Sequence, residues 1–238
     1  GQHDWPGLAG HLYVKSGTAM AMSDCVKITI RGKQAHGAQP EDSIDPIVLG
    51  AYMITRLQTV VSREISGNDM AVVTVGTFHG GLKENIIPAS AEFTLNIRTF
   101  DEEVREHVLE AVRRIIKAEA QASRAPEPLI EEIYSFPRCY NDPDLAESLL
   151  KRFAEEFGED QVHRDKAHTG SEDFGRFGDE INVPYVYWHF GAYSPSKFKG
   201  KEAPAGIHSP FFASDDVVTT LETGVRAALT AIFTHVGK

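Results

Sequence analysis

The chain has 238 residues, of which 42% are apolar and 24% charged, a composition typical of globular proteins that excludes disorder, collagen and coiled coil. No stretch approaches the roughly 20 apolar residues of a membrane-spanning helix. The 24 basic and 34 acidic side chains give a net charge of −10, which repels nucleic acid phosphates and anionic lipid, and no Lys/Arg-rich run offsets it. We therefore expect neither nucleic acid nor a membrane as a partner.

The two cysteines and the start of the chain indicate its setting. Cys25 and Cys139 are too few and too far apart to form a disulfide framework or a CxxC metal site. We therefore expect a reducing, cytoplasmic location. Gly1 is neither an initiator methionine nor the start of a signal peptide, which predicts that the chain is a segment of a longer protein.

Residues 23–134 have the pattern of a small α+β domain of their own. The sequence VKITIRG from Val26 alternates apolar and polar residues, which predicts a strand with one wet face. The next predicted elements are a helix over 45–62 with Ile47, Ala51, Ile54, Leu57 and Val61 in its apolar row, strands over 71–78 and 92–99, a helix over 101–124 with a capping box from Thr99, and a strand over 129–134. This β-α-β-β-α-β order predicts a four-stranded antiparallel sheet with two helices on one face.

The flanking segments, 1–22 and 135–238, predict only part of an α/β domain. A helix is expected over 142–157 and a strand, buried on both faces, in the apolar run 183–190. The last helix begins after Ser214-Asp215-Asp216. We expect its apolar row to face inward: Val218, Leu221, Val225, Leu229 and Ile232. One strand and two helices are too few to form a self-sufficient α/β layer.

Histidines are the first candidates for chemistry, because imidazole is both a common metal ligand and a group that titrates near neutral pH. His3, His36 and His208 stand in loops punctuated by Gly, Pro or Ser, where functional side chains concentrate. Taken one at a time, each also fits an ordinary loop histidine. Four others are expected to be structural: His11, His107, His163 and His235.

Five motifs occur in order along the chain: GQHDWP, RGKQAHGAQPEDSIDPI, VGTFHGGLKENIIPASAEFTLNIRTF, GSEDF and HSPFF. Together they resemble the C-terminal two-thirds of the metal-dependent aminoacylase and carboxypeptidase superfamily, in particular its hippurate hydrolase and auxin-conjugate hydrolase branch. The resemblance implies an α/β fold in which a catalytic domain is interrupted by a lid that also dimerises. The implied divisions are 1–22 for a first catalytic segment, 23–134 for the lid and 135–238 for the second catalytic segment.

The resemblance also implies roles for single residues. His3 and His208 resemble the two histidines that each bind one ion of a dinuclear centre, with Zn, Mn, Co or Ni as the candidate metals. His36 resembles the lid histidine that stabilises the oxyanion in the opposite subunit's site. Asn85 and Arg98 resemble residues that hold the substrate carboxylate, although Arg98 also fits an exposed strand residue. Gly80-Gly81 bends the backbone toward substrate or forms a simple bulge, and GSEDF receives no definite role.

Two features of the family are missing from the sequence. The family's Cys-x-His pair does not occur, and Glu131-Glu132 falls in the last predicted lid strand rather than before His3. These motifs supply the general base and further metal ligands, so we expect the chain alone to be inactive and to bind no ions tightly.

The implied function is hydrolysis of the amide bond of N-acyl amino acids or related conjugates by a homodimer that acts on small molecules. Two alternatives stay open. One is a non-catalytic dimerisation or ligand-binding module, and the other is a dipeptidase or deacetylase of the same superfamily.

Overall fold

The computed structural model describes residues 1–200 and 202–236, which form a mixed α/β structure with several sheets. The chain divides into two compact units. Unit 1 comprises residues 1–20, 139–168 and 173–238, and unit 2 comprises 21–138 and 169–172. No helix in the described ranges is long and apolar enough to cross a membrane.

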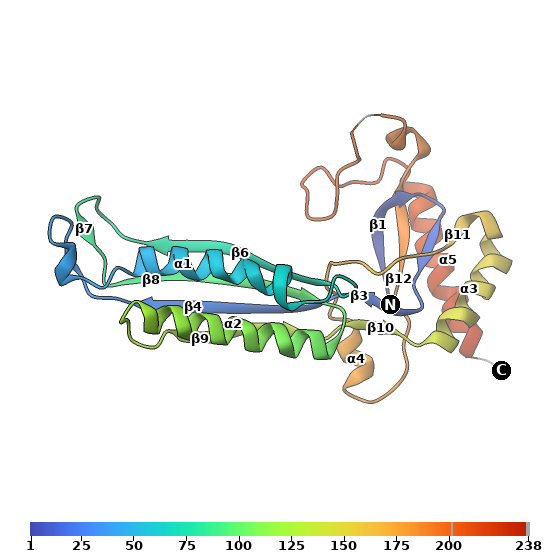
Figure 1. Ribbon diagram of the computed structural model, residues 1–238. Helices are drawn as coiled ribbons and strands as arrows, with labels where there is room; N and C mark the ends of the chain where they lie inside the picture. Colours follow the sequence, from blue (N-terminus) through green and yellow to red (C-terminus); the bar gives the residue numbers. More distant parts are fainter. Residues whose placement is uncertain (201, 237–238) are drawn as a thin grey trace. The chain divides into compact units, whose positions relative to one another are not determined.

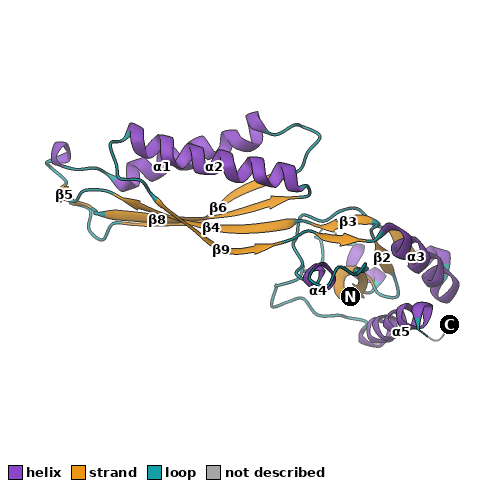
Figure 2. Ribbon diagram, turned by 90° about the horizontal axis from the view of Figure 1, so that it is seen from below, coloured by secondary structure: helices purple, strands orange, loops and turns teal. Residues whose placement is uncertain are grey.

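Unit 2 is built on a four-stranded antiparallel sheet with the strand order β6-β8-β4-β9. Helices α1 and α2 both lie on one face of this sheet (Figure 2). In chain order the elements are β4 (Met22–Arg31), α1 (Pro46–Thr59), β6 (Ala71–Gly80), β8 (Ser90–Thr99), α2 (Glu102–Ala122) and β9 (Leu129–Phe136). A π-helical turn, η2 (Val60–Glu64), continues α1.

The core of unit 2 lies between the sheet and its two helices. Alternate residues of β4 and β8 are fully buried there, including Ile28, Phe93 and Leu95, as the period-two pattern predicts. The spacing of Val104, Val108, Val112 and Ile115 predicts the apolar row of α2, and the last three of these residues are buried. In the row predicted for α1, Leu57 is confirmed as buried, whereas Ala51 and Val61 are exposed. The buried face of α1 also carries Leu49 and Met53, which the prediction missed.

Both helices of unit 2 begin at an aspartate. The Asp45-Pro46 pair predicts a cap followed by proline in the first turn, and the Asp45 side chain indeed accepts hydrogen bonds from the backbone N–H groups of Ile47 and Val48. For α2 the cap is Asp101, which accepts from Glu103 and Val104, so the capping box predicted from Thr99 is wrong. A carboxylate satisfies the free N–H groups of a first turn as well as a hydroxyl does, and Asp101 stands closer to the helix.

A buried ion pair connects α2 to the sheet of unit 2. Asp24 on β4 is 1% exposed, and Arg105 on α2 donates to both of its carboxylate oxygens at 2.8 and 2.7 Å. Ser135 on β9 donates a third hydrogen bond to the same carboxylate at 2.8 Å. The hydrogen bonds of Arg105 to Asp24, together with one to Glu102, raise the pKa of Arg105, although burial opposes them.

The strands β5 (Ala35–His36) and β7 (Ile86–Ile87) form a separate two-residue ladder at the end of unit 2 where β8 begins (Figure 1). A 3₁₀ turn, η1 (Pro40–Asp42), follows β5. This ladder is the smallest sheet of the unit. It contains His36, and Asn85 directly precedes β7.

Unit 1 contains a mixed four-stranded sheet with the order β1-β12-β2-β11. Its strands are β1 (Gln2–Leu8), β12 (Trp188–Tyr193), β2 (Leu12–Val14) and β11 (Val162–Arg164). β1 runs parallel to β12, and β2 runs antiparallel to β12 and parallel to β11. At Gly191 a Cβ atom would lie 1.9 Å from the Leu8 carbonyl oxygen, so the approach of β1 to β12 requires glycine.

One face of this sheet packs against α3 (Pro143–Phe157) and α5 (Val217–His235). Leu12, Leu149, Phe153 and Trp188 form the centre of that core. Asp142 caps α3 as predicted, and Asp216 caps α5. The remaining elements of unit 1 are β3 (Gly17–Met20), β10 (Cys139–Asn141), η3 (Glu159–Gln161), α4 (Gly175–Asp179) and η4 (Pro195–Phe198).

Two predictions for unit 1 are wrong. The apolar row of α5 faces outward rather than inward, and its five residues are between 46% and 67% exposed: Val218, Leu221, Val225, Leu229 and Ile232. The buried face instead carries small side chains such as Thr220, Thr223 and Ala227, which let the helix approach β12 closely. The run 183–190 is not one buried strand, because β12 begins only at Trp188 and Val183 is 45% exposed.

Candidate functional site

Four aromatic side chains form a row across the sheet of unit 1. His3 on β1 pairs in register with His189 on β12, His189 pairs with Tyr13 on β2, and Tyr13 pairs with His163 on β11. Register partners point to the same face of a sheet, and Trp188, which precedes His189, belongs to the core on the other face. The row therefore gives one face of the sheet an imidazole-rich surface.

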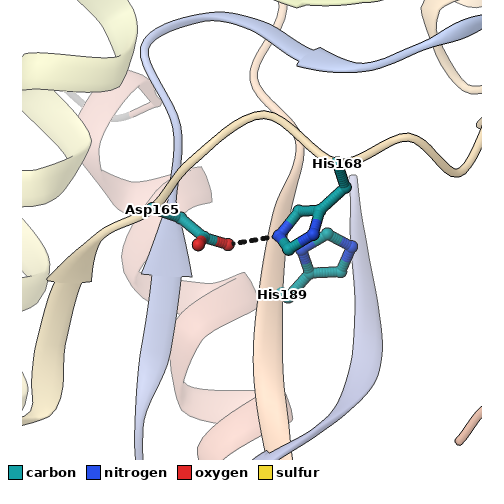
Figure 3. Close-up of side chains that lie close together, drawn as sticks. All are labelled: Asp165, His168 and His189. Atoms are coloured by element: carbon teal, nitrogen blue, oxygen red, sulfur yellow. Dashed lines mark hydrogen bonds and ion pairs between the residues drawn. The ribbon is translucent and has the colours of Figure 1, made fainter.

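At the centre of this face, Asp165, His168 and His189 converge (Figure 3). One ligand atom of each residue lies within 4.8 Å of those of the other two. His168 Nε2 is 2.7 Å from Asp165 Oδ2, and these two side chains are only 16% and 17% exposed. In the described part of the chain, this is the one group of three or more His, Cys, Asp or Glu side chains that are close enough to share a metal ion.

Aromatic rings contact both histidines of the cluster. The Trp5 ring centroid lies 4.2 Å from that of His189 and 4.8 Å from that of His168. The Tyr187 ring meets the His189 ring edge-on at 5.4 Å. The two imidazoles therefore pack against apolar ring surfaces on this face of the sheet.

This environment changes the charge of the cluster. Burial, together with the neighbouring His168, lowers the pKa of His189 to about 4, so its ring is neutral at physiological pH. Burial alone would raise the pKa of Asp165, but hydrogen bonds from His168 and the Lys166 N–H, with the charges of both histidines, lower it overall. A carboxylate beside two imidazole rings is a donor set suited to a cation.

His3 stands beside this group without belonging to it. Its side chain is 47% exposed, and its Nδ1 lies 2.9 Å from the Asp4 carboxylate and 2.6 Å from the Asp4 carbonyl oxygen. Both neighbours of Nδ1 are acceptors, so that nitrogen carries the proton and Nε2 keeps its lone pair. A histidine oriented in this way is prepared to bind a metal ion through Nε2.

His208 lies in the exposed loop before α5, with a left-handed backbone at φ 66°. Among the described residues its ring makes no hydrogen bond or ion pair, and it belongs to no ligand group with His3. The structure thus leaves the ring of His208 unbonded and that of His3 bonded only through Nδ1, and it does not bring the two histidines together.

In unit 2, His36 and Asn85 lie side by side at the β5–β7 ladder. His36 pairs with Ile86, and the Gly37 N–H donates to the Asn85 carbonyl at 2.8 Å. The Ala38 N–H donates to His36 Nδ1 at 3.1 Å, so a neutral His36 ring carries its proton on the exposed Nε2. That nitrogen is a hydrogen-bond donor without a partner among the described residues.

Arg98 lies near the other end of β8. Its Nε donates to the Asn96 side chain at 2.6 Å, and its Nη1 is buried without a hydrogen-bond partner in the described residues. A guanidinium nitrogen without a hydrogen-bond partner can donate to an anion such as a carboxylate. About eight residue steps of β8 separate it from Ser90, which corresponds to about 27 Å.

Other residues selected from the sequence have more ordinary surroundings. His107 is exposed, and the side chain of His235 lies outside the described residues. His11 and His163 form a stacked pair, with Nδ1 of the first 2.8 Å from Nε2 of the second. Gly80-Gly81 borders a shallow cavity, and in GSEDF the Gly170 carbonyl accepts a hydrogen bond from the Ala21 N–H.

Sequence reasoning missed Asp165, His168 and His189. His189 stands in the apolar run that was interpreted as core, and the other two lie in a loop without a known motif. The available signal was the spacing of an aspartate and a histidine three residues apart, which is too common to be selective.

Comparison with known proteins identifies the central part of the chain. The peptidase dimerisation domain of the M20 peptidases matches residues 21–124. The chain thus carries an M20 dimerisation domain. The match covers all of the sheet and helices of unit 2 except β9.

Similarity to M20 proteins extends beyond the dimerisation domain. The chain is 31% identical to N-acetylcysteine deacetylase of Bacillus subtilis over 98% of its own length and 58% of the relative's. It is 33% identical to hippurate hydrolase of Campylobacter jejuni, over 79% of this chain and 49% of that one. The chain therefore spans about half the length of the curated relatives it matches.

A solved structure has the same fold. The YXEP protein of Bacillus subtilis, described as a dinuclear metal binding peptidase from the M20 family, superposes with a TM-score of 0.70 at 26% identity. The match covers 98% of this chain and 56% of that protein. Both units, and not the dimerisation domain alone, therefore follow the M20 fold.

Proposed function

We propose that this chain is part of a metal-dependent amidohydrolase that cleaves the amide bond of N-acyl amino acids or related conjugates. The observation that carries the proposal is the similarity over nearly the whole chain to a deacetylase of N-acetylcysteine, with hippurate hydrolase as a second relative. Both relatives are named for acylated amino acids. The proposed substrate class is therefore a small molecule with an amide and a free carboxylate.

The proposed metal ligands are His3 and His208, one for each of two divalent ions such as Zn, Mn, Co or Ni. The free Nε2 of His3, with its Nδ1 held by Asp4, fits this role. When bound, such ions lower the pKa of a water molecule and polarise the scissile carbonyl. Since the described residues provide only one imidazole for each ion, we expect the chain by itself to bind two ions weakly and to show no turnover.

His36 is proposed to donate a hydrogen bond to the oxyanion that forms on the attacked carbonyl. Its neutral ring presents Nε2–H, because Nδ1 already accepts the Ala38 N–H. A donor of this kind stabilises charge that develops only in the transition state. Its removal should therefore lower kcat and leave KM almost unchanged.

Asn85 and Arg98 are proposed to hold the substrate carboxylate. The unpaired Nη1 of Arg98 fits that role. However, the β5–β7 ladder and Arg98 stand about 27 Å apart along β8, further than an N-acyl amino acid reaches. If both act on one substrate, they come from different copies of the chain.

That geometry makes a homodimer part of the proposal, in keeping with the dimerisation domain at 21–124. Light scattering on the purified chain should report a dimer. A strictly monomeric chain at high micromolar concentration would contradict this part. A cytoplasmic location, consistent with two free cysteines, belongs to the same proposal.

The decisive experiment is a hydrolysis assay of an active preparation, either this chain or a longer protein that contains it, on a panel of N-acetyl and N-benzoyl amino acids. His36→Ala should lower kcat about 100-fold with KM nearly constant. Arg98→Ala should chiefly raise KM, and Arg98→Lys should restore it in part, because a point charge replaces a two-pronged guanidinium.

Complementation tests the use of two copies. Mixing His36→Ala subunits with His208→Ala subunits should restore activity in heterodimers. If activity stays absent although the subunits exchange, His36 acts within its own subunit or not at all. Wild-type kcat in His36→Ala would remove it from the mechanism.

The same panel separates the alternatives. The similarity to N-acetylcysteine deacetylase favours a deacetylase, which would prefer short acyl groups over benzoyl groups and over dipeptides. Absence of hydrolysis on every substrate, from a preparation that contains two bound metal ions, would favour a dimerisation or ligand-binding module.

A further inference from the structure

The cluster of Asp165, His168 and His189 has the spacing of a metal site. Two of its members come from the loop after β11 and the third from β12, so the fold rather than the local sequence brings them together. Their ligand atoms lie within 4.8 Å of one another. Ligands around a tetrahedral ion with bonds of about 2.0–2.2 Å stand about 3.3–3.6 Å apart, so small side-chain rotations suffice.

The ring of His189 is free of hydrogen bonds in the described part of the chain. The residue is only 4% exposed. The ring contacts those of Trp5, Tyr187 and His168. A nitrogen of this ring is therefore available to bind a cation.

The donor set selects the kind of cation. Two imidazoles and one carboxylate suit Zn²⁺, Co²⁺ or Ni²⁺, whereas Mg²⁺ and Ca²⁺ prefer sets of oxygen ligands. We propose that Asp165, His168 and His189 bind one divalent transition-metal ion with three protein ligands. Three ligands leave a fourth position for water or a second molecule.

This site is distinct from the centre assigned to His3 and His208, and it does not depend on the proposed function. Neither of those histidines is part of the cluster, although His3 is the register neighbour of His189. The two assignments can therefore fail separately. The experiment has to tell an ion held by the cluster from an ion held by His3.

Trp5 provides a spectroscopic reporter that needs no enzymatic activity. Its ring touches those of both histidines at 4.2 and 4.8 Å, so a paramagnetic ion in the cluster should quench its fluorescence. The full 238-residue chain, freed of metal by a chelator, would be titrated with Co²⁺ while tryptophan emission and visible Co²⁺ absorption are recorded. We expect saturation at one equivalent, displacement by Zn²⁺, and loss of most of the quenching in Trp5→Phe.

The variants assign the ligands. His168→Gln and Asp165→Asn should each weaken Co²⁺ binding at least tenfold, and both side chains border solvent, so the fold should survive as judged by circular dichroism. His107→Gln, at an exposed histidine of unit 2, is the matched control and should bind as tightly as wild type. His3→Gln and His208→Gln show whether the ion is held elsewhere. His189→Asn should also abolish binding, because it removes the ligand that β12 contributes.

Two outcomes would overturn the proposal. One is no saturable Co²⁺ binding below 1 mM, which would leave Asp165 and His168 as a hydrogen-bonded pair. The other is binding that His3→Gln or His208→Gln abolishes and His168→Gln leaves intact. That result would place the ion in the centre of the proposed hydrolase and remove it from the cluster.

Discussion

Replacing Arg105 with alanine tests the buried ion pair that joins α2 to the sheet of unit 2. In the native state Asp24 is 1% exposed and accepts two hydrogen bonds from Arg105 and one from Ser135. The variant would leave the carboxylate buried with the Ser135 hydroxyl as its remaining partner. The free energy of unfolding of unit 2 should therefore fall, because a buried charge has lost its counterion.

The structure sets the size of this loss. Removal of one partner from a buried ion pair costs about 3–5 kcal/mol, and Arg105 itself is only 20% exposed, so solvent screens the pair weakly. A loss of about 3 kcal/mol would lower the Tm of a unit of this size by about 10 °C. Arg152→Ala is the control, since Arg152 pairs with Glu155 on the surface, where both side chains are about half exposed. It should change stability by less than about 0.5 kcal/mol.

Hydrogen exchange of peptides from β4 and β9 would report the stability of unit 2 separately from that of unit 1. The double variant Asp24→Asn/Arg105→Met should be more stable than Arg105→Ala, because it removes the buried charge along with its partner. A change below 1 kcal/mol for Arg105→Ala would show that Asp24 is hydrated or protonated in the native protein, and the argument from burial would fail.

Three further predictions concern unit 1. Gly191→Ala should lower the free energy of unfolding of unit 1 by about 2 kcal/mol or more, because the new Cβ meets a backbone carbonyl of β1. The control is Gly67→Ala in unit 2, where the new Cβ meets nothing within 4 Å. Measured by urea denaturation, that variant should change the free energy of unfolding by less than about 1 kcal/mol. Burial and the neighbouring His163 lower the pKa of His11 in the folded protein, so the unfolded chain binds a proton at this residue more readily than the folded one. The free energy of unfolding, followed by tryptophan fluorescence, should therefore fall as the pH drops below about 6.5. The fall should be less steep in His11→Gln. Val225→Lys, at a residue 59% exposed, should reduce binding of an apolar dye and leave the Tm nearly unchanged, whereas Ala227→Lys, at a buried residue, should unfold unit 1.

The sequence was most informative where the pattern of side chains is set by local burial. In β4 and β8 buried residues alternate with more exposed ones. The alternation of apolar and polar residues therefore predicted both the strands and the residues that face the core. The aspartate caps and the end of α3 at Gly158, with its φ of 96°, follow from rules that involve only a few neighbouring residues.

The sequence failed where a tertiary contact decides the outcome. The apolar row of α5 has the spacing of a core face, yet the helix turns its small residues to the sheet. β1 contains Pro6 and Gly7, and β2 has only three residues. Both strands depend on a partner far along the chain. No local rule reveals such pairings.

The candidate site shows the same division. The motifs selected His3, His36, Asn85, Arg98 and His208, and their roles stay predictions. The structure adds that His36 and Asn85 share one ladder and that Arg98 has an unpaired nitrogen. Asp165, His168 and His189 could not be selected, because only the pairing of β11 and β12 with β2 brings them together.

The antiparallel pairing of β3 with β10 has a consequence for how this protein is synthesised and how it can be recombined. Met20 lies opposite Cys139, at the two points where the chain leaves unit 1 and returns to it. During synthesis, residues 21–138 leave the ribosome before β12, so the inserted unit can fold before β1 pairs with β12. A short turn from Met20 to Cys139 would close the same ladder as a hairpin, which makes this junction a natural place to remove the insert or exchange it for another.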